Sequence, residues 1–302
     1  PKPNPHRSPE SLVLMLRDWH AYEIVAAERV RGFNAYNADV FGARVRRIVD
    51  SARTIKRMME DGGWRFPRGV IALNGDLISG TLHEIERHAD APNVVLAAYG
   101  CAMVLAAAIR DLSADFAKLE VFCTAGNHGR LPDARRVQQK DPLRSWDALI
   151  ALWAKEMLRA VYGVRFYIPN SYSVGFAVEG WNFLQTHGHD VKSWNALPWY
   201  GLNRLVSNVN ALEASRGRTI HHYLFGHFHT AASLPHAAGE SFINGSLIGG
   251  TELSVQGMGR SDPPAQWMFG VHPKNGITHR WALRADVDAK SPRYDTKPWV
   301  TL

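Results

Sequence analysis

The sequence predicts an α/β fold, and three observations carry this prediction. Short apolar runs at residues 12–16, 70–73 and 121–123 are typical of strands buried on both faces. Stretches with helical periodicity alternate with these runs, as expected for a sheet that is covered by helices. Polar motifs follow directly on the apolar runs, at the carboxyl ends of the predicted strands, where ligands collect in α/β proteins.

The stretch between the first two predicted strands is expected to form a long helix. Apolar residues recur there at steps of three and four, which places them on one helix face: Phe41, Val45, Ile48, Ala52, Ile55 and Met59. Gly62 and Gly63 then supply a stop. Basic residues occupy the other faces, and we interpret them as solvated surface rather than as a stripe for nucleic acid: Arg46, Arg53 and Arg57.

Residues 94–109 are apolar enough to raise the question of a membrane span. The segment falls short of the ~20 residues that a spanning helix needs, and it contains Gly100. It also lies between two polar motifs that are expected to meet in space. We therefore predict a buried helix and no membrane partner.

The second half of the chain predicts further strands. Residues 172–178 and 181–186 flank Glu179-Gly180, which is typical of a hairpin. Another strand is expected over residues 221–225. The last two predicted strands form a closing hairpin, at residues 266–272 and 277–283.

The composition is that of an ordinary globular protein, with 46% hydrophobic and 21% charged residues in 302. Lys and Arg outnumber Asp and Glu by 35 to 28, a net charge of +7, which favours a polyanionic partner. The two cysteines, Cys101 and Cys123, exclude a disulfide framework and favour a reducing compartment, the cytoplasm. The start shows no secretory signal and no Met, so we expect the chain to be cut from a longer one.

Five short motifs carry the chemistry, and they occur in one order. They are Asp18-Trp19-His20, Gly75-Asp76, Gly126-Asn127-His128, His187-Gly188-His189 and Gly226-His227-Phe228-His229. Imidazole, carboxylate and carboxamide groups are ligands for divalent transition metals. Because each motif leaves a predicted strand at its carboxyl end, the five are expected to converge on one small volume that suits two neighbouring ions.

With these motifs, the chain resembles the calcineurin-like metallophosphoesterase family, whose pattern is Asp-x-His, Gly-Asp, Gly-Asn-His, a lone His and Gly-His-x-His. All five blocks are present in order and span residues 18–229. The resemblance implies a four-layered α/β/β/α sandwich. It also implies a metallophosphoesterase catalytic domain over residues 11–290, between a linker or truncated N-terminus at 1–10 and an irregular tail at 291–302.

The resemblance also assigns roles to single residues. One metal is expected to be held by Asp18, His20 and His229, and the other by Asn127, His187 and His227. Asp76 is expected to bridge the two ions. His128 is expected near the scissile phosphate as a catalytic residue that binds no metal.

The expected cofactors are two divalent metal ions. A mixed nitrogen and oxygen shell suits manganese, iron or zinc better than calcium; we predict manganese, with iron, zinc and magnesium as alternatives. Two ions bring four positive charges against the two negative charges of Asp18 and Asp76, so the site attracts phosphate. Such ions can share a hydroxide that attacks phosphorus in line, while His128 protonates the leaving oxygen or steadies the phosphate.

Two positions depart from the family pattern. Gly129 stands where many members carry an acidic residue that orients the catalytic His, and Asp133 is a candidate substitute. Ser79 stands where the second motif often ends in an acidic or amide residue. We expect both departures to affect the tuning of His128, and neither removes a metal ligand.

Substrate contacts are expected from two places. His189 is either a substrate contact or a structural residue. Residues 130–144 form a basic run after the third motif, in which Arg130, Arg135 and Arg136 are candidates for contact with a phosphate backbone. Ordinary surface charge is the alternative for this run.

We predict a phosphodiesterase that acts on DNA or RNA, because the basic surplus and the Arg-rich run favour such a substrate. The Asn34-Ala35-Tyr36-Asn37 segment before a basic helix is also similar to metallophosphoesterases of bacteriophages that are grouped with DNA-repair exonucleases. A phosphoesterase for cyclic nucleotides or phosphomonoesters is the first alternative. The second is a non-catalytic scaffold of the same fold, although the chain keeps every ligand position.

Overall fold

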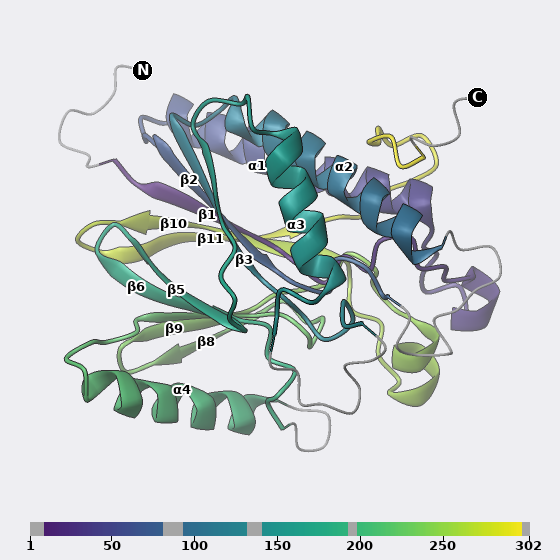
Figure 1. Cartoon of the computed structure of the whole chain (residues 1–302). Coiled ribbons are helices and arrows are strands. Elements are labelled where there is room, and N and C mark those ends of the chain that lie inside the picture. The colour runs from purple at the N-terminus through teal and green to yellow at the C-terminus, as the bar shows by residue number, and fades with distance from the viewer. Residues whose placement is uncertain (1–8, 81–92, 132–140, 193–197, 298–302) are drawn as a thin grey trace.

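Two β-sheets lie face to face at the centre of the molecule (Figure 1). The computed structural model describes residues 9–80, 93–131, 141–192 and 198–297. The first sheet has the strand order β11-β10-β1-β2-β3-β4, and the second has the order β5-β6-β7-β9-β8. Strands β1 to β4 are parallel, whereas β10 pairs with β1 in the antiparallel sense.

The bounds of the elements follow the predictions for the first half of the chain closely. The first sheet consists of β1 (Ser11–Leu16), β2 (Arg68–Asn74), β3 (Lys118–Thr124), β4 (Val164–Tyr167), β10 (Ala265–His272) and β11 (Gly276–Arg284). The second consists of β5 (Ser173–Val178), β6 (Trp181–Thr186), β7 (His222–Phe225), β8 (Ala232–His236) and β9 (Gly239–Ile243). The main helices are α1 (Ala38–Asp61), α2 (Val94–Ser113), α3 (Trp146–Met157) and α4 (Trp199–Ala214).

The alternation of side chains in the strands produces the layers. In β1, Leu12, Leu14 and Leu16 point away from Val13 and Met15, because successive residues of a strand face opposite sides. Leu14 and Leu16 belong to the core under α1, α2 and α3, and Val13 and Met15 to the core between the two sheets. Packing on both sides explains why this strand is an unbroken apolar run.

The outer face of the second sheet is covered by α4. Leu202 and Val206 of this helix pack with Tyr223 and Phe225 of β7. The order of layers is therefore α/β/β/α, with three helices on one side and α4 on the other (Figure 1). The predicted four-layered sandwich is confirmed.

Helix α1 shows how the predicted basic face is used. Asn37 caps its amino end, where the side-chain oxygen accepts a hydrogen bond from Val40 N at 3.0 Å. Arg46 pairs with Asp50 and Asp111, and Arg53 pairs with Asp115 near the end of α2. These arginines therefore belong to the helix surface, as predicted, and several of their charges are paired within the chain.

The apolar segment at residues 94–109 lies in α2. This helix is long and apolar enough to cross a membrane by length and composition alone. In the molecule it lies on the first sheet between α1 and α3, and its buried residues are part of the core there. The predicted core helix is confirmed. The C-terminal stretch up to residue 297 is irregular, yet Tyr22 donates a hydrogen bond to the carbonyl of Thr296 in it.

Candidate metal centre

The five motifs leave the carboxyl ends of β1, β2, β3, β6 and β7, as the sequence predicts. The first three strands are parallel neighbours in one sheet, and β6 and β7 are parallel neighbours in the other. The two sheets pack face to face, so these ends meet at one side of the sandwich. Loops that are distant in sequence therefore share one site.

The backbone turns sharply at this site. Of the eight described non-glycine residues with a positive φ, five carry predicted ligand side chains: Asp18 (52°), His20 (46°), Asp76 (49°), His227 (68°) and His229 (58°). The left-handed conformation costs roughly 1–2 kcal/mol for a residue with a Cβ atom. Strain of this kind persists where the surrounding structure enforces it, and here it turns neighbouring side chains toward a common centre.

The loops after β2 and β3 approach each other closely at a glycine. Gly75 has a φ of 70°, and a Cβ atom on it would lie 2.0 Å from Gly126 N. Any side chain at this position would push the two loops apart. The contact lets the backbone N–H of His128 donate to Asp76 Oδ1 at 2.7 Å, which ties the second motif to the third.

The first ligand cluster contains Asp18, His20 and His229, whose candidate ligand atoms all lie within 4.8 Å of one another. The Nε2 atoms of His20 and His229 are 3.2 Å apart. Asp18 Oδ1 lies 3.7 Å from His229 Nε2. The backbone N–H of His227 donates to Asp18, so the first and fifth motifs also hold each other in place.

The second cluster contains Asp76, His187 and His227, also within 4.8 Å. His187 Nε2 lies 2.8 Å from Asp76 Oδ2 and 3.1 Å from Asn127 Oδ1. The other ring nitrogen, Nδ1, lies 3.0 Å from the carbonyl oxygen of Asn74, to which it donates. That bond orients the ring and directs Nε2 at the cluster, as the outer partners of metal-binding histidines do.

These donor atoms fit a pair of divalent ions. Two imidazole nitrogens that face each other at 3.2 Å can share only one proton. Atoms bound to one ion at about 2.1 Å lie roughly 3–3.5 Å apart in a tetrahedral shell, so a cation satisfies both nitrogens. The mixed imidazole, carboxylate and carboxamide set suits manganese, iron or zinc. A third group, His20, Asp76 and His128, joins the two clusters and brings His128 to the same centre.

Burial keeps two of the imidazoles in the neutral form, which can bind a metal ion. Burial lowers the pKa of His227 to about 3 and that of His229 to about 4, so both rings are neutral and keep a lone pair. Burial raises the pKa of Asp18 to about 7, against the opposing charge of His187. Burial alone would lower the pKa of His187, but Asp76 raises it to about 9. A metal ion at His187 would therefore have to displace a proton.

Ser79, one of the two departures from the family pattern, contacts His20 in the structure, and its effect on His128 stays a prediction. Ser79 Oγ lies 2.9 Å from His20 Nδ1 and donates a short hydrogen bond to the carboxylate of Glu23. The Ser79 hydroxyl thus connects the His20 ring to the carboxylate of Glu23. Ser79 thus places a carboxylate, that of Glu23, next to a position where the family often has an acidic or amide residue, and the sequence analysis did not single out Glu23.

Asp147 was missed as well, and it explains Gly129. This buried side chain lies in the first turn of α3 and accepts hydrogen bonds from the backbone N–H groups of Leu77 (3.0 Å) and Gly126 (2.9 Å). A Cβ atom on Gly129 would lie 2.5 Å from Asp147 Oδ2. The carboxylate therefore comes from α3 and occupies the space next to the third motif. Asp133 lies outside the described residues.

The predicted substrate contacts fall into two groups. His189 lies beside the second cluster, with its ring 5.6 Å from that of His187 and 6.0 Å from that of Tyr172. Burial, with the charges of His187 and Arg130, lowers the pKa of His189 to about 4. Arg135 and Arg136 lie outside the described residues, so their role stays a prediction.

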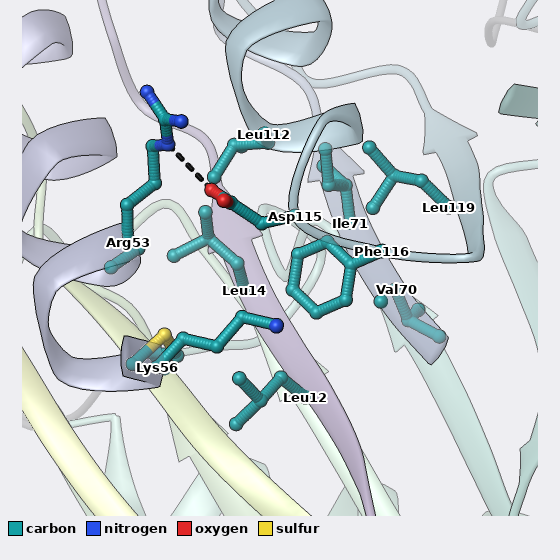
Figure 2. A pocket seen from close by; sticks show the side chains of 13 residues that line it. Leu12, Leu14, Arg53, Lys56, Val70, Ile71, Leu112, Asp115, Phe116 and Leu119 are labelled. Atoms are coloured by element: carbon teal, nitrogen blue, oxygen red, sulfur yellow. Dashed lines mark hydrogen bonds and ion pairs between the residues drawn. The ribbon is translucent and has the colours of Figure 1, made fainter. Parts of the chain in front are cut away.

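A small cavity lies at the other end of the strands, away from the candidate metal ligands. Figure 2 shows the side chains that line it. Leu12, Gly69 and Leu119 line it at the amino-terminal halves of β1, β2 and β3, beside Lys56 and Phe116. Its volume is about 20 Å³, room for one water molecule. It is a gap in the packing under α1 and α2 and offers no space for a ligand.

No protein-family profile and no curated protein matches the sequence. Several solved structures are similar in fold. An archaeal phosphodiesterase is 10% identical over 90% of this chain and 99% of its own, with a TM-score of 0.39. A predicted phosphoesterase from Streptococcus pneumoniae is 11% identical over 91% and 99%, with a TM-score of 0.34. Vps29 from Chaetomium thermophilum is 10% identical over 93% and 100%, with a TM-score of 0.38.

At these identities and TM-scores, the likeness does not show what this chain does. Independently of those structures, the chain combines the four-layered sandwich with five ordered motifs that meet at the carboxyl ends of its strands. The chain therefore has the architecture and the motif order of the calcineurin-like metallophosphoesterases. Its chemistry has to be argued from its own side chains.

Proposed function

We propose that this chain is a metal-dependent phosphodiesterase that uses two divalent ions, with manganese as the preferred metal, and cleaves DNA or RNA. One observation carries the proposal: two ligand clusters lie side by side and are connected through Asp76 and His20. A pair of ions about 3.5–4 Å apart supplies a nucleophile at neutral pH and stabilises the charge that develops on a phosphate ester.

The chain's own residues supply position and proton transfer. Asp76 belongs to the second cluster and to the group that joins the two clusters, so its carboxylate would help to hold both ions. His128 is held by its backbone hydrogen bond to Asp76 and by an edge-to-face contact with His20, with ring centroids 4.7 Å apart. A half-buried imidazole at this place can donate a proton to the leaving oxygen. His189 lies beside the second cluster and can bind the substrate there, and Arg130 is a further candidate for that contact.

The substrate class rests on charge. The net charge of +7 and the basic run that follows His128 favour a polyanion over a small neutral ester. Cys101 and Cys123 are buried free thiols, which fits the reducing cytoplasm as the place of action.

Activity assays with a reloaded metal test this proposal. The protein is stripped of metal, reloaded with manganese and offered a diester chromogen, a monoester chromogen and labelled single- and double-stranded DNA and RNA. We expect nucleic-acid cleavage, and His128→Ala should reduce it ~10²–10⁴-fold because the proton donor is lost. His279→Ala is the matched control, since this imidazole packs against Trp64 and Trp281 on the first sheet. Hydrolysis of small esters alone would favour a small-substrate enzyme, and no turnover with any metal would favour a scaffold.

The basic run makes a separate prediction. If Arg135 and Arg136 each contact one backbone phosphate, Arg135→Ala with Arg136→Ala should reduce the slope of log affinity against log salt by about 2 for duplex DNA. Fluorescence anisotropy with labelled DNA at several salt concentrations measures this slope. An unchanged slope would show that both arginines are ordinary surface residues.

A further inference from the structure

Arg260 reaches the metal centre from a part of the chain that carries no motif. It follows the short helical turn Leu253–Gly257, and its side chain extends to the fifth motif. Arg260 Nη2 donates to the carbonyl of Phe228 at 3.2 Å and makes a short hydrogen bond to Thr230 Oγ1. These two residues flank His229, so the guanidinium lies beside a ligand of the first cluster.

A carboxylate fixes the orientation of this guanidinium. Nε and Nη2 both donate to Asp262 Oδ2, at 3.0 and 2.5 Å, and Thr230 Oγ1 contacts the same oxygen at 3.2 Å. Every side-chain hydrogen bond that Arg260 makes to the described residues uses Nε or Nη2, and its backbone N–H donates to the carbonyl of Ser254 at 2.8 Å. The Nη1 edge is left for another acceptor, and the side chain is 35% exposed.

An isolated pair with Asp262 is a weak reason for this arrangement, because an exposed ion pair contributes about 0–1 kcal/mol. A guanidinium held by one edge presents its other edge in a fixed geometry, which is how arginine binds phosphate oxygens. The position also suits an anionic ligand, since two divalent ions bring more positive charge to the centre than Asp18 and Asp76 remove.

We propose that Arg260 is a substrate-binding residue whose Nη1 edge donates to an oxygen of the phosphate group bound beside the first cluster, with Asp262 as the residue that positions it. This inference rests on the proposed function and adds a contact on the His229 side of the site. His189 lies on the other side, beside the second cluster. The phosphate of the ester is then held between two flanks.

The test compares Arg260→Gln and Arg260→Lys with Arg280→Gln in the manganese-loaded full chain. Arg280 is a matched control because it donates through Nε and Nη2 to one carboxylate, that of Glu240, and is 41% exposed. Two quantities are measured: the Kd for inorganic phosphate by calorimetry and kcat/KM for a diester chromogen. Manganese binding is measured in parallel to show that the ligand set is intact.

We expect Arg260→Gln to raise the Kd for phosphate at least 10-fold and to lower kcat/KM about 10- to 100-fold, because one charged hydrogen bond is lost. Arg260→Lys should lie between the wild type and Arg260→Gln, and Arg280→Gln should match the wild type. A Kd and a kcat/KM within twofold of the wild type in Arg260→Gln would overturn the inference. So would a wild type that binds no phosphate. If the wild type binds phosphate through Arg260 but hydrolyses nothing, the proposed activity fails while the anion site stands.

Discussion

Glu120, near the amino end of β3, and Asp76, just past the carboxyl end of β2, are both buried carboxylates, but their surroundings differ. Glu120 accepts hydrogen bonds from Arg68 Nε (2.8 Å) and Tyr167 Oη (2.9 Å), and Lys118 Nζ lies 2.9 Å away. These partners outweigh burial and lower the pKa of Glu120. The negative charge of Glu120 is therefore compensated by groups of the protein itself.

Asp76 lies among several imidazoles, and these groups cannot all form hydrogen bonds with one another. Burial would raise its pKa, yet His187, His128 and His20 hold it well below the usual value. The same imidazoles point nitrogens at each other, as the 3.2 Å between His20 and His229 shows. The backbone at Asp76 is also in the left-handed region, with a φ of 49°.

The difference separates stability from binding capacity. Buried charges with complete partners stabilise the fold and have nothing left to offer a ligand. Convergent groups on a strained backbone retain binding capacity, and they cluster at functional sites. Substitutions of Asp76 should therefore affect metal binding and activity, whereas substitutions of Glu120 should affect stability.

The largest effect is expected for Asp76→Asn. The amide keeps the Oδ1 acceptor for His128 N but loses the charge between the two clusters. We expect kcat/KM to fall by ~10³-fold or more, equal to about 4 kcal/mol of transition-state stabilisation. Manganese at 100 times its Kd should stabilise the wild type by about 2.7 kcal/mol, and this gain should disappear in the variant. Thermal unfolding with and without manganese measures this gain in stability. A variant that keeps both its kcat/KM and its stabilisation by manganese would contradict the proposed difference between Asp76 and Glu120.

An intermediate effect is expected at Asp147. Asp147→Ala leaves the N–H groups of Leu77 and Gly126 without their acceptor, which should cost about 2–4 kcal/mol of folding free energy and weaken manganese binding. Gly129→Asp alone should also destabilise the protein, because the new side chain meets Asp147 Oδ2.

The two changes together make the sharper experiment. Asp147→Ala with Gly129→Asp returns a carboxylate to the place next to the third motif and removes the clash. Urea unfolding and manganese titration should show the double variant to be better than the sum of the two single losses. Simple additivity would mean that Asp147 does not take the place of the acidic residue.

The smallest effect is expected for Glu120→Gln, and it should appear in stability alone. The folded pKa of Glu120 lies below its ordinary value of 4.5, so its contribution is present above that value and is lost as the pH falls through the folded pKa. We expect a loss of about 1–3 kcal/mol at pH 7 that shrinks below roughly pH 4.5. Urea unfolding of both proteins from pH 3 to 7 checks this. The stabilisation by manganese should be unchanged; if it changes, the two ends are coupled.

The central strands and the placement of the motifs were predictable because both are local patterns. An apolar run such as residues 70–73 and the Gly75-Asp76 that follows it are adjacent in the chain. By contrast, β4 and the β8–β9 pair were not predicted. These strands are short and partly exposed, and β8 contains Pro235, so their sequences lack the apolar run that marked β1 to β3.

The residues that support the site could not be found in this way. Asp147 lies 19 positions after the third motif's last residue, His128, and Arg260 lies 31 positions after His229. Neither stands in a pattern, since a single Asp or Arg is an ordinary surface residue in a sequence. Ser79 was noticed, but its partners, His20 and Glu23, depend on how the loops after β1 and β2 lie against each other.

By itself, the sequence determined which donor groups this protein carries and that each one leaves a buried strand, because ligand chemistry and strand periodicity are written in neighbouring residues. Only the tertiary structure decided which groups meet. The contact of His20 with His229 joins residues 209 positions apart, and the bond from Leu77 to Asp147 spans 70. Such contacts depend on how the two sheets and their loops pack, and neighbouring residues in the sequence do not encode this packing.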